Sequence, residues 1–287
     1  MDTGTTTSAG VRSAIRVLKR RIHGAKAGPR EEDFLAIEDP LEISVSALHG
    51  SRRVKHNLSL TMRTPGNDPD LILGNLFASG IIRSASDVEE IQFDPPEGDA
   101  PPTRASVRLS PGIKYSPAKN ARLSPVLSSC GVCGSGSLAR LALPRSLQIT
   151  ERTAFPRELI HHLPGRMRES QPTFARTGGL HAAAIFATDG KMLAVREDIG
   201  RHNALDKTVG AALSSGWIPA PGHILCVSGR MSYEILQKAL VARMEVIAGV
   251  GAPSSLAVAL AEDFGVTLLG FVRNGSYSIY CCPERIE

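Results

Sequence analysis

The sequence predicts an α/β fold in which helices flank a mixed sheet, preceded by an N-terminal α+β lobe. Three observations support this class. The second half alternates short buried apolar runs with longer amphipathic ones, as strands and helices that follow one another do. The first half has strand-like alternation around one apolar helical run. Hydrophobic residues make up 42% of the chain and charged residues 21%, which is the composition of a globular protein.

The N-terminal α+β lobe is predicted over residues 31–150 and carries a CxxC loop near its end. Apolar and polar residues alternate in three segments, which predicts half-buried strands. These are "LEISVSA" (41–47), "HNLSLTMRT" (56–64) and "TRASVRLS" (103–110). The run "LILGNLFASGII" (71–82) predicts a buried helix between the second and third strands.

The α/β domain is predicted over residues 151–287. A helix is expected over 155–167, and a hairpin over 182–198 because Thr-Asp-Gly marks a tight turn. Strands and helices then alternate to the end of the chain, which builds a mixed or parallel sheet. The expected elements are a helix at 201–217, a strand at 223–229, a helix at 232–244, a strand and turn at 245–253, a helix at 254–265 and a strand or strand pair at 266–282.

The basic charge of the chain is concentrated at its start. Residues 1–30 contain seven Lys and Arg and one Asp, so their net charge is +6. The whole chain has a net charge of +5, so residues 31–287 together carry −1. We expect residues 1–30 to be a disordered, solvated tail, because the segment opens on a polar low-complexity run. Binding of this tail to nucleic acid is the less favoured alternative.

The expected location is the cytoplasm. No run of about 18 or more apolar residues is present, which argues against a membrane span. The N-terminus lacks the apolar core of a secretory signal, and five cysteines do not suggest a disulfide framework. We therefore expect neither a membrane partner nor a nucleic-acid partner.

Candidate ligand-binding loops follow three of the predicted strands. Ligands in open α/β sheets bind outside the carboxyl ends of the strands, and free backbone N–H groups at helix starts bind phosphate. The first loop contains Ser228, Gly229 and Arg230, the second is "GAPSS" (251–255), and the third contains Arg273 and Ser276. Each loop alone could be an ordinary turn, but three together favour a phosphate-bearing ligand.

Three further side chains could face such a ligand. Arg201 and His202 lie where the helix of 201–217 begins, and His181 precedes the apolar strand at 182. The alternative for the first two is an exposed, capped helix start, and for His181 a packing role.

The CxxC pair, Cys130 and Cys133, allows several kinds of site. Structural zinc needs four ligands and an iron–sulfur cluster needs four cysteines, and no second CxxC is present. A redox dithiol remains an alternative. The glycines around the pair favour a nucleophilic thiolate on an accessible loop. We expect no structural metal. Cys226 lies inside an apolar strand, which predicts that it is a core residue.

Several blocks together resemble one family. "SSCGVCGSGSL", "GGLHAAAIFATDGKMLAVREDIGRHNALDK", "SGRMSYEILQKAL" and "GFVRNGSYSIYCCPERI", with "EDPLEI" and "TMRTPGNDPDLILGNLFASGII", are similar to the formate dehydrogenase accessory sulfurtransferases, the FdhD family. The resemblance covers residues 33–287. It implies a fold like that of cytidine deaminases and a tendency to form homodimers.

The resemblance also implies an activity. A cysteine desulfurase would supply sulfur, held as a persulfide on Cys130 with Cys133 as second cysteine, for the molybdenum bis(molybdopterin guanine dinucleotide) cofactor of formate dehydrogenase. The cofactor-binding segment would comprise Phe271, Val272, Arg273, Asn274, Gly275 and Ser276. The alternative is a chaperone that binds and delivers this cofactor without covalent sulfur transfer. Deamination is not expected, because Ala183 stands where zinc deaminases have the Glu of His-x-Glu.

Overall fold

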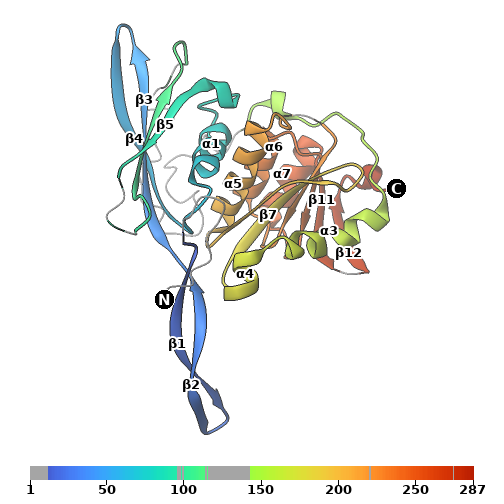
Figure 1. The fold of residues 1–287 in the computed structure, drawn as a ribbon. Coiled ribbons are helices and arrows are strands. Elements are labelled where there is room, and N and C mark those ends of the chain that lie inside the picture. Colours follow the sequence, from blue (N-terminus) through green and yellow to red (C-terminus); the bar gives the residue numbers. More distant parts are fainter. Residues whose placement is uncertain are drawn as a thin grey trace.

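The computed structural model describes residues 12–95, 98, 100–113, 115, 143–219, 221–273 and 275–287. Within them the chain forms a two-stranded, a four-stranded and a six-stranded sheet with helices between and around them (Figure 1). The predicted α/β class with a mixed sheet flanked by helices is confirmed. The likeness to cytidine deaminases stays a prediction.

The four-stranded sheet has the order β4-β3-β6-β5. Its strands are β3 (Asp39–His49), β4 (Arg52–Arg63), β5 (Val88–Phe93) and β6 (Arg104–Leu109), and α1 (Asp68–Ala78) connects β4 to the rest of the sheet. β3 pairs antiparallel with β4 and parallel with β6. The alternating segments of the sequence thus form strands at the predicted places, and β5 is an additional one.

The six-stranded sheet has the order β12-β11-β10-β9-β7-β8. β9, β10 and β11 run parallel to each other, whereas β7 is antiparallel to β8 and β9, and β12 is antiparallel to β11. The strands are β7 (His181–Ala187), β8 (Met192–Asp198), β9 (His223–Val227), β10 (Val246–Gly249), β11 (Thr267–Arg273) and β12 (Ser276–Cys281).

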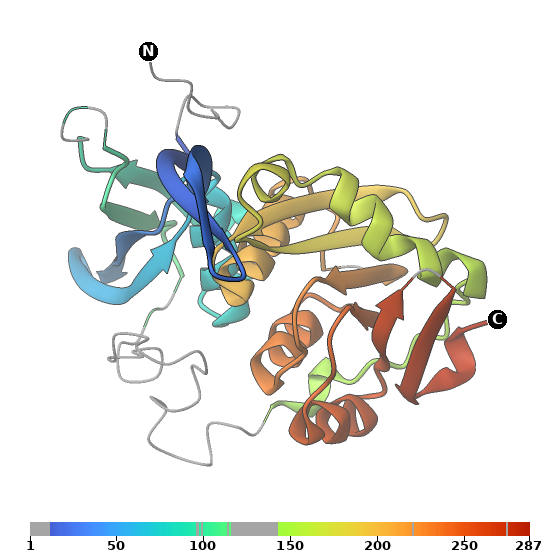
Figure 2. The same cartoon turned by 90° about the horizontal axis from the view of Figure 1, so that it is seen from below.

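Helices cover both faces of this sheet. They are α3 (Arg157–Glu169), α4 (Pro172–Thr177), α5 (Arg201–Ser214), α6 (Tyr233–Val241) and α7 (Ser255–Phe264), with short 3₁₀ turns at Ala85–Asp87, Arg145–Leu147 and Pro283–Arg285. Successive strand residues point to opposite faces, so the fully apolar strands bury both. Ala183, Ile185 and Leu225 pack toward α5, α6 and α7, and Ala184 and Cys226 pack toward α3. Figure 2 shows α3 on one side of the sheet and α6 and α7 on the other.

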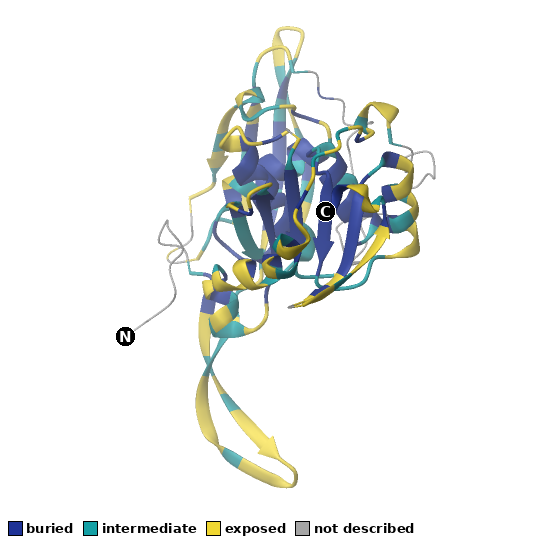
Figure 3. Ribbon diagram, turned by 90° about the vertical axis from the view of Figure 1, so that its right-hand side faces the viewer, coloured by how far each residue is buried: buried dark blue, intermediate teal, exposed yellow. Residues whose placement is uncertain are grey.

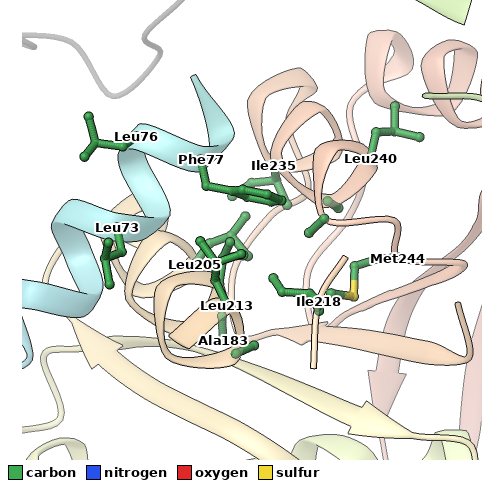
Figure 4. Close-up of a cluster of buried hydrophobic side chains, with 14 of the residues drawn as sticks. Leu73, Leu76, Phe77, Ala183, Leu205, Leu213, Ile218, Ile235, Leu240 and Met244 are labelled. Atoms are coloured by element: carbon green, nitrogen blue, oxygen red, sulfur yellow. The ribbon is translucent and has the colours of Figure 1, made fainter. Parts of the chain in front are cut away.

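One hydrophobic core joins the four-stranded sheet to the six-stranded one. Leu73, Leu76 and Phe77 of α1 lie in the same cluster as Leu205 of α5 and Ile235 of α6 (Figure 4). α1 and α5 meet at two glycines. A Cβ on Gly74 would overlap the Asp206 carbonyl, and a Cβ on Gly210 would overlap the Asp70 carbonyl. The two helices therefore cross with their backbones in contact.

The N-terminal segment corrects the sequence prediction. Residues predicted as part of a disordered tail over 1–30 form β1 (Ala14–His23), which pairs antiparallel with β2 (Lys26–Ala36). The prediction is wrong for residues 14–30; residues 1–11 lie outside the described part. The predicted boundary at residue 30 separated the basic residues of β1 from their acidic partners, which begin at residue 31. Salt bridges join Arg16 to Glu32 and Lys19 to Asp33 across the strands, each at 2.8 Å.

No helix among the described residues is both long and apolar enough to cross a membrane.

Candidate functional site

His181 and Ser228 meet at one end of the six-stranded sheet. His181 begins β7, and Ser228 directly follows β9, the neighbouring antiparallel strand. The Ser228 hydroxyl accepts a hydrogen bond from the Ala182 backbone N–H at 2.9 Å and lies 3.3 Å from His181 Nδ1. The Ser228 backbone N–H donates to the Ala182 carbonyl at 3.0 Å. The strand pairing therefore fixes both side chains.

Arg201 also lies beside His181, next to Gly229. A Cβ on Gly229 would lie 3.4 Å from His181 Nδ1 and 3.6 Å from Arg201 Cδ. Gly229 therefore lies in van der Waals range of both side chains. The structure thus brings His181, Arg201, Ser228 and Gly229 together, as the sequence suggested for a ligand site.

The loops after β9, β10 and β11 are joined through their backbones. The Gly251 N–H donates to the Gly229 carbonyl at 3.3 Å, and the Phe271 N–H donates to the Gly251 carbonyl at 3.2 Å. A Cβ on Gly251 would lie 3.0 Å from the Gly229 oxygen. The three predicted strand-end loops therefore form one continuous surface.

The segment 271–276 ends β11 and begins β12. Phe271 is 41% exposed and has a φ of 54°, whereas Val272 is buried. Arg273 pairs in register with Ser276, both exposed, and Gly275 has a φ of 87°. Such positive φ values are costly for residues with side chains, so the loop holds Phe271 in a conformation that the sequence alone would not favour. Asn274 lies outside the described residues.

A cavity of about 540 Å³ opens beside His181 and Ser228. Its walls come from α3, α4 and the strand ends. They are largely apolar with a few polar groups, which is the usual character of small-molecule sites. The lining residues outside the strand ends include Met167, Arg168, Gln171, Phe174, Gly178 and Gly179.

Two features of this cavity were not predicted from the sequence. The Arg168 guanidinium lies 3.4 Å from the centre of the Phe174 ring, forming a cation–π pair in the wall. Gln171 is only 3% exposed, and its Nε2 has no hydrogen-bond partner among the described residues. A buried, unpaired donor costs about 1–3 kcal/mol, so this amide is ready to bind an acceptor of a ligand. The only sequence signal nearby is the Gly178–Gly179 pair ahead of His181.

His181 is held neutral at physiological pH. Burial lowers the pKa of its imidazole below the ordinary value of 6.5, and the Arg201 charge lowers it further, while Asp198 opposes the shift. A neutral imidazole can both donate and accept hydrogen bonds at its two ring nitrogens. Arg201 is therefore the side chain that supplies positive charge next to His181.

Asp198 fixes the turn that leads to Arg201. Its buried carboxylate accepts hydrogen bonds from Gly200 N–H at 2.9 Å and Thr64 N–H at 3.2 Å, and forms a 2.7 Å salt bridge with Lys207. Burial raises the pKa of Asp198, and the Lys207 ammonium opposes that shift. Because Thr64 follows β4, this carboxylate also ties the N-terminal lobe to the start of α5.

His202 and Arg230 do not line the cavity, although Arg230 directly follows Gly229. His202 Nε2 is 3.0 Å from the Glu234 carboxylate on α6, so its ring faces that helix. Arg230 is exposed on the loop after β9. Neither residue lines the cavity beside His181.

Cys130 and Cys133 lie outside the described residues. The three described cysteines are poor nucleophiles. Burial raises the pKa of the Cys226 and Cys281 thiols to about 12 in each case, and it also raises the pKa of Cys282. Because the thiolate is the reactive form, none of these three is suited to accept sulfur at neutral pH.

Comparison with known proteins gives consistent matches. Residues 36–287 match the FdhD/NarQ family. A protein from Sulfolobus acidocaldarius named sulfur carrier protein FdhD is 41% identical over 275 residues, which is 95% of this chain and 100% of that one. A protein of the same name from Mycobacterium tuberculosis is 42% identical over 261 residues, 88% of this chain and 92% of its own.

The fold also matches a solved structure. A crystal structure of a candidate formate dehydrogenase accessory protein from Desulfotalea psychrophila superposes with a TM-score of 0.71. It covers 96% of this chain and 99% of its own, at 22% identity, so the likeness concerns the fold.

Proposed function

Because the chain belongs to the FdhD/NarQ family, we propose that it carries sulfur as a persulfide on Cys130 and delivers it to a molybdenum bis(molybdopterin guanine dinucleotide) cofactor. A cysteine desulfurase is the donor, and formate dehydrogenase is the enzyme that receives the sulfurated cofactor. The observation that carries the ligand half of this proposal is the cavity beside His181, Arg201 and Ser228, built at the strand ends where nucleotides bind in such sheets.

The sulfur step is an exchange between thiolates. The Cys130 thiolate attacks the outer sulfur of the desulfurase persulfide, a new S–S bond forms, and the desulfurase cysteine leaves as a thiolate. Cys130 then holds the outer sulfur in the sulfane state. Its release to the cofactor as sulfide takes two electrons, which the Cys133 thiol could supply by attacking the inner sulfur, so that a Cys130–Cys133 disulfide forms and sulfide leaves. A free cysteine has a pKa of about 8.5, so a nearby cation would raise its thiolate fraction at neutral pH.

The cavity has features suited to the guanine nucleotide ends of the cofactor. The Arg168–Phe174 pair could stack on a base, and the Gln171 amide could donate to a carbonyl oxygen. The phosphates would then face the strand-end loops, where Arg201 and Arg273 supply positive charge. A neutral His181 could serve as donor or acceptor without adding charge.

The work is proposed to take place in the cytoplasm, where thiols stay reduced and a persulfide carrier can cycle. The homodimer expected from the family resemblance stays a prediction at this point.

Intact-protein mass spectrometry tests the carrier chemistry. The wild-type protein, incubated with a cysteine desulfurase and cysteine, should gain the mass of one sulfur that a reductant removes. Cys130→Ala should show no such gain. Cys282→Ala is the matched control, because it removes a partly buried thiol outside the CxxC pair, and it should keep the gain. A gain that persists in Cys130→Ala and disappears in Cys133→Ala would exchange the roles of the two cysteines.

The rival function is a chaperone that binds and delivers the cofactor. It predicts that Cys130→Ala still activates formate dehydrogenase, and that no variant or wild type gains sulfur. The carrier proposal instead predicts that Cys130→Ala retains cofactor binding and loses activation.

A further inference from the structure

A buried ion pair lies one residue from the wall of the cavity, and the proposed sulfur chemistry assigns it no role. Asp198 ends β8, and Lys207 lies on α5. Their exposed fractions are 0% and 1%, within the interior that Figure 3 draws in dark blue, and the ammonium nitrogen lies 2.7 Å from Asp198 Oδ2. A buried ion pair adds little stability compared with an apolar contact of the same size, because both charges lose their hydration. The position of this pair therefore points to a task beyond stabilising the fold.

The ion pair is bound to the N-terminal lobe through one residue. Thr64 directly follows β4 and is 2% exposed. Its carbonyl accepts a hydrogen bond from Lys207 Nζ at 2.7 Å, and its N–H donates to Asp198 Oδ2 at 3.2 Å. Its hydroxyl oxygen accepts from the Ile199 N–H at 3.1 Å. Thr64 therefore holds both the ion pair and the residue that follows Asp198.

The turn after Asp198 carries residues of the ligand site. Ile199 lines the cavity, and the Gly200 N–H donates to Asp198 Oδ1 at 2.9 Å. Arg201 begins α5 directly after Gly200. His181 is the register partner of Asp198 across β7 and β8. A displacement of the Asp198 carboxylate would therefore move the residues that surround one end of the cavity.

We propose that Lys207 and Thr64 are positioning residues for the ligand site. They hold Asp198 and the turn that follows it, and this turn places Ile199 and Arg201 for a nucleotide end of the cofactor. The inference rests on the proposed function, which supplies the ligand. It adds a role in binding for the N-terminal lobe, although the described residues that line the cavity all belong to the α/β domain.

A second buried ion pair provides a matched control. Lys238 Nζ lies 2.6 Å from Asp206 Oδ2, and this pair joins α6 to α5. The Asp206 side chain is 3% exposed and that of Lys238 11%, and neither lines the cavity. Lys207→Met and Lys238→Met therefore each take an ammonium group away from a buried carboxylate. Only the first does so next to the turn at 198–200.

Isothermal titration calorimetry of the full-length protein with guanosine diphosphate at pH 7.5 tests the proposal. Lys207→Met and Thr64→Val should each weaken binding roughly tenfold or more, because each removes a contact that fixes the turn. Lys238→Met should bind within about twofold of the wild type, because its ion pair joins two helices instead. Thr64→Ser keeps the hydroxyl that accepts the Ile199 N–H and should also retain binding. Wild-type affinity in both Lys207→Met and Thr64→Val, or an equal loss in Lys238→Met, would overturn the proposal.

The histidine NMR signals of the unliganded protein separate positioning from a general loss of stability. The His181 imidazole signals, assigned by their absence in His181→Gln, should shift in Lys207→Met and in Thr64→Val, because the charges beside the ring change position. They should stay in place in Lys238→Met. Unchanged His181 signals in both of the first two variants would contradict the proposal.

The two measurements also separate this inference from the proposed function. A wild type that binds no guanosine diphosphate would refute the ligand half of the proposed function. The His181 signals need neither nucleotide nor sulfur, so they decide the positioning role in that case as well.

Discussion

At the scale of single residues, the site is organised by buried polar groups. Ser228 is positioned by the backbone of Ala182, and Asp198 by the N–H groups of Thr64 and Gly200. The Ala182–Ser228 and Thr64–Asp198 contacts connect segments far apart in sequence, so they preorganise the surface before any ligand arrives.

The buried imidazole of His181 makes stability depend on pH. Its folded-state pKa lies below the ordinary value of 6.5, so the unfolded chain binds the proton more readily than the folded one. The contribution of His181 to the free energy of unfolding is therefore complete above pH 6.5. It decreases as the pH falls from there toward the folded-state pKa.

Urea unfolding at pH 7.5, 6.5 and 5.5 measures this effect. His181→Gln should lose less stability on acidification than the wild type does. His162→Gln removes an exposed imidazole from α3 and controls for the loss of a histidine. Equal acid sensitivity of the wild type and His181→Gln would contradict the assignment.

At the scale of elements, the crossing of α1 and α5 depends on two glycines. Gly74→Ala or Gly210→Ala should destabilise the protein by about 1–3 kcal/mol or more, because the added methyl group would overlap a backbone carbonyl and force the helices apart. Gly165→Ala is the control: a Cβ at Gly165 in α3 would meet nothing within 4 Å, and the change should stabilise by about 0.5–1 kcal/mol. Chemical denaturation measures all three. A neutral Gly74→Ala would mean that the two helices are further apart.

Much of the fold follows from sequence period and turn residues. The apolar runs at β9 and β10 correctly predict strands, and the amphipathic runs at α5 and α6 correctly predict helices. In these segments the local sequence pattern and the burial in the fold agree. The β1–β2 hairpin was missed because the predicted tail boundary at residue 30 separated the basic residues of β1 from their acidic partners at 31–33 of β2. α4 was missed because six residues carry too little periodicity.

The site was predictable in part. Glycines at strand ends indicated the loops that hold Ser228 and Gly229, and the structure brings them together with His181 and Arg201. Gln171 and the Arg168–Phe174 pair carry no local pattern, since an amide or a cation–π contact depends on which helices meet. His202 was expected to face a ligand because it follows Arg201, but its side chain faces Glu234 of α6 instead.

At the scale of the whole molecule, the shared core predicts that the two larger sheets unfold together. Leu76 of α1 is fully buried in the cluster that also contains residues of α5, α6 and α7. Leu76→Ala should destabilise the protein by about 2–5 kcal/mol. Trp217, the only tryptophan, follows α5 and reports on the six-stranded sheet.

The urea midpoints of unfolding measured by Trp217 fluorescence and by far-UV circular dichroism should therefore both decrease by the same amount in Leu76→Ala. Leu60→Ala, at a leucine that is 44% exposed on β4, should leave both midpoints in place. A Trp217 transition that does not move in Leu76→Ala would show that the lobes unfold independently.

The position of α4 has a consequence for binding equilibria. One side of this helix contacts the base of the β1–β2 hairpin: Thr173 lies against Ser13, which precedes β1, and Arg176 lies over Phe34 of β2. Phe174 on the same helix lines the cavity. A ligand that fixes α4 therefore also acts on the element that supports the hairpin. Any binding event at the hairpin that shifts α4 is linked to ligand affinity in the cavity, and each must change the other by the same factor.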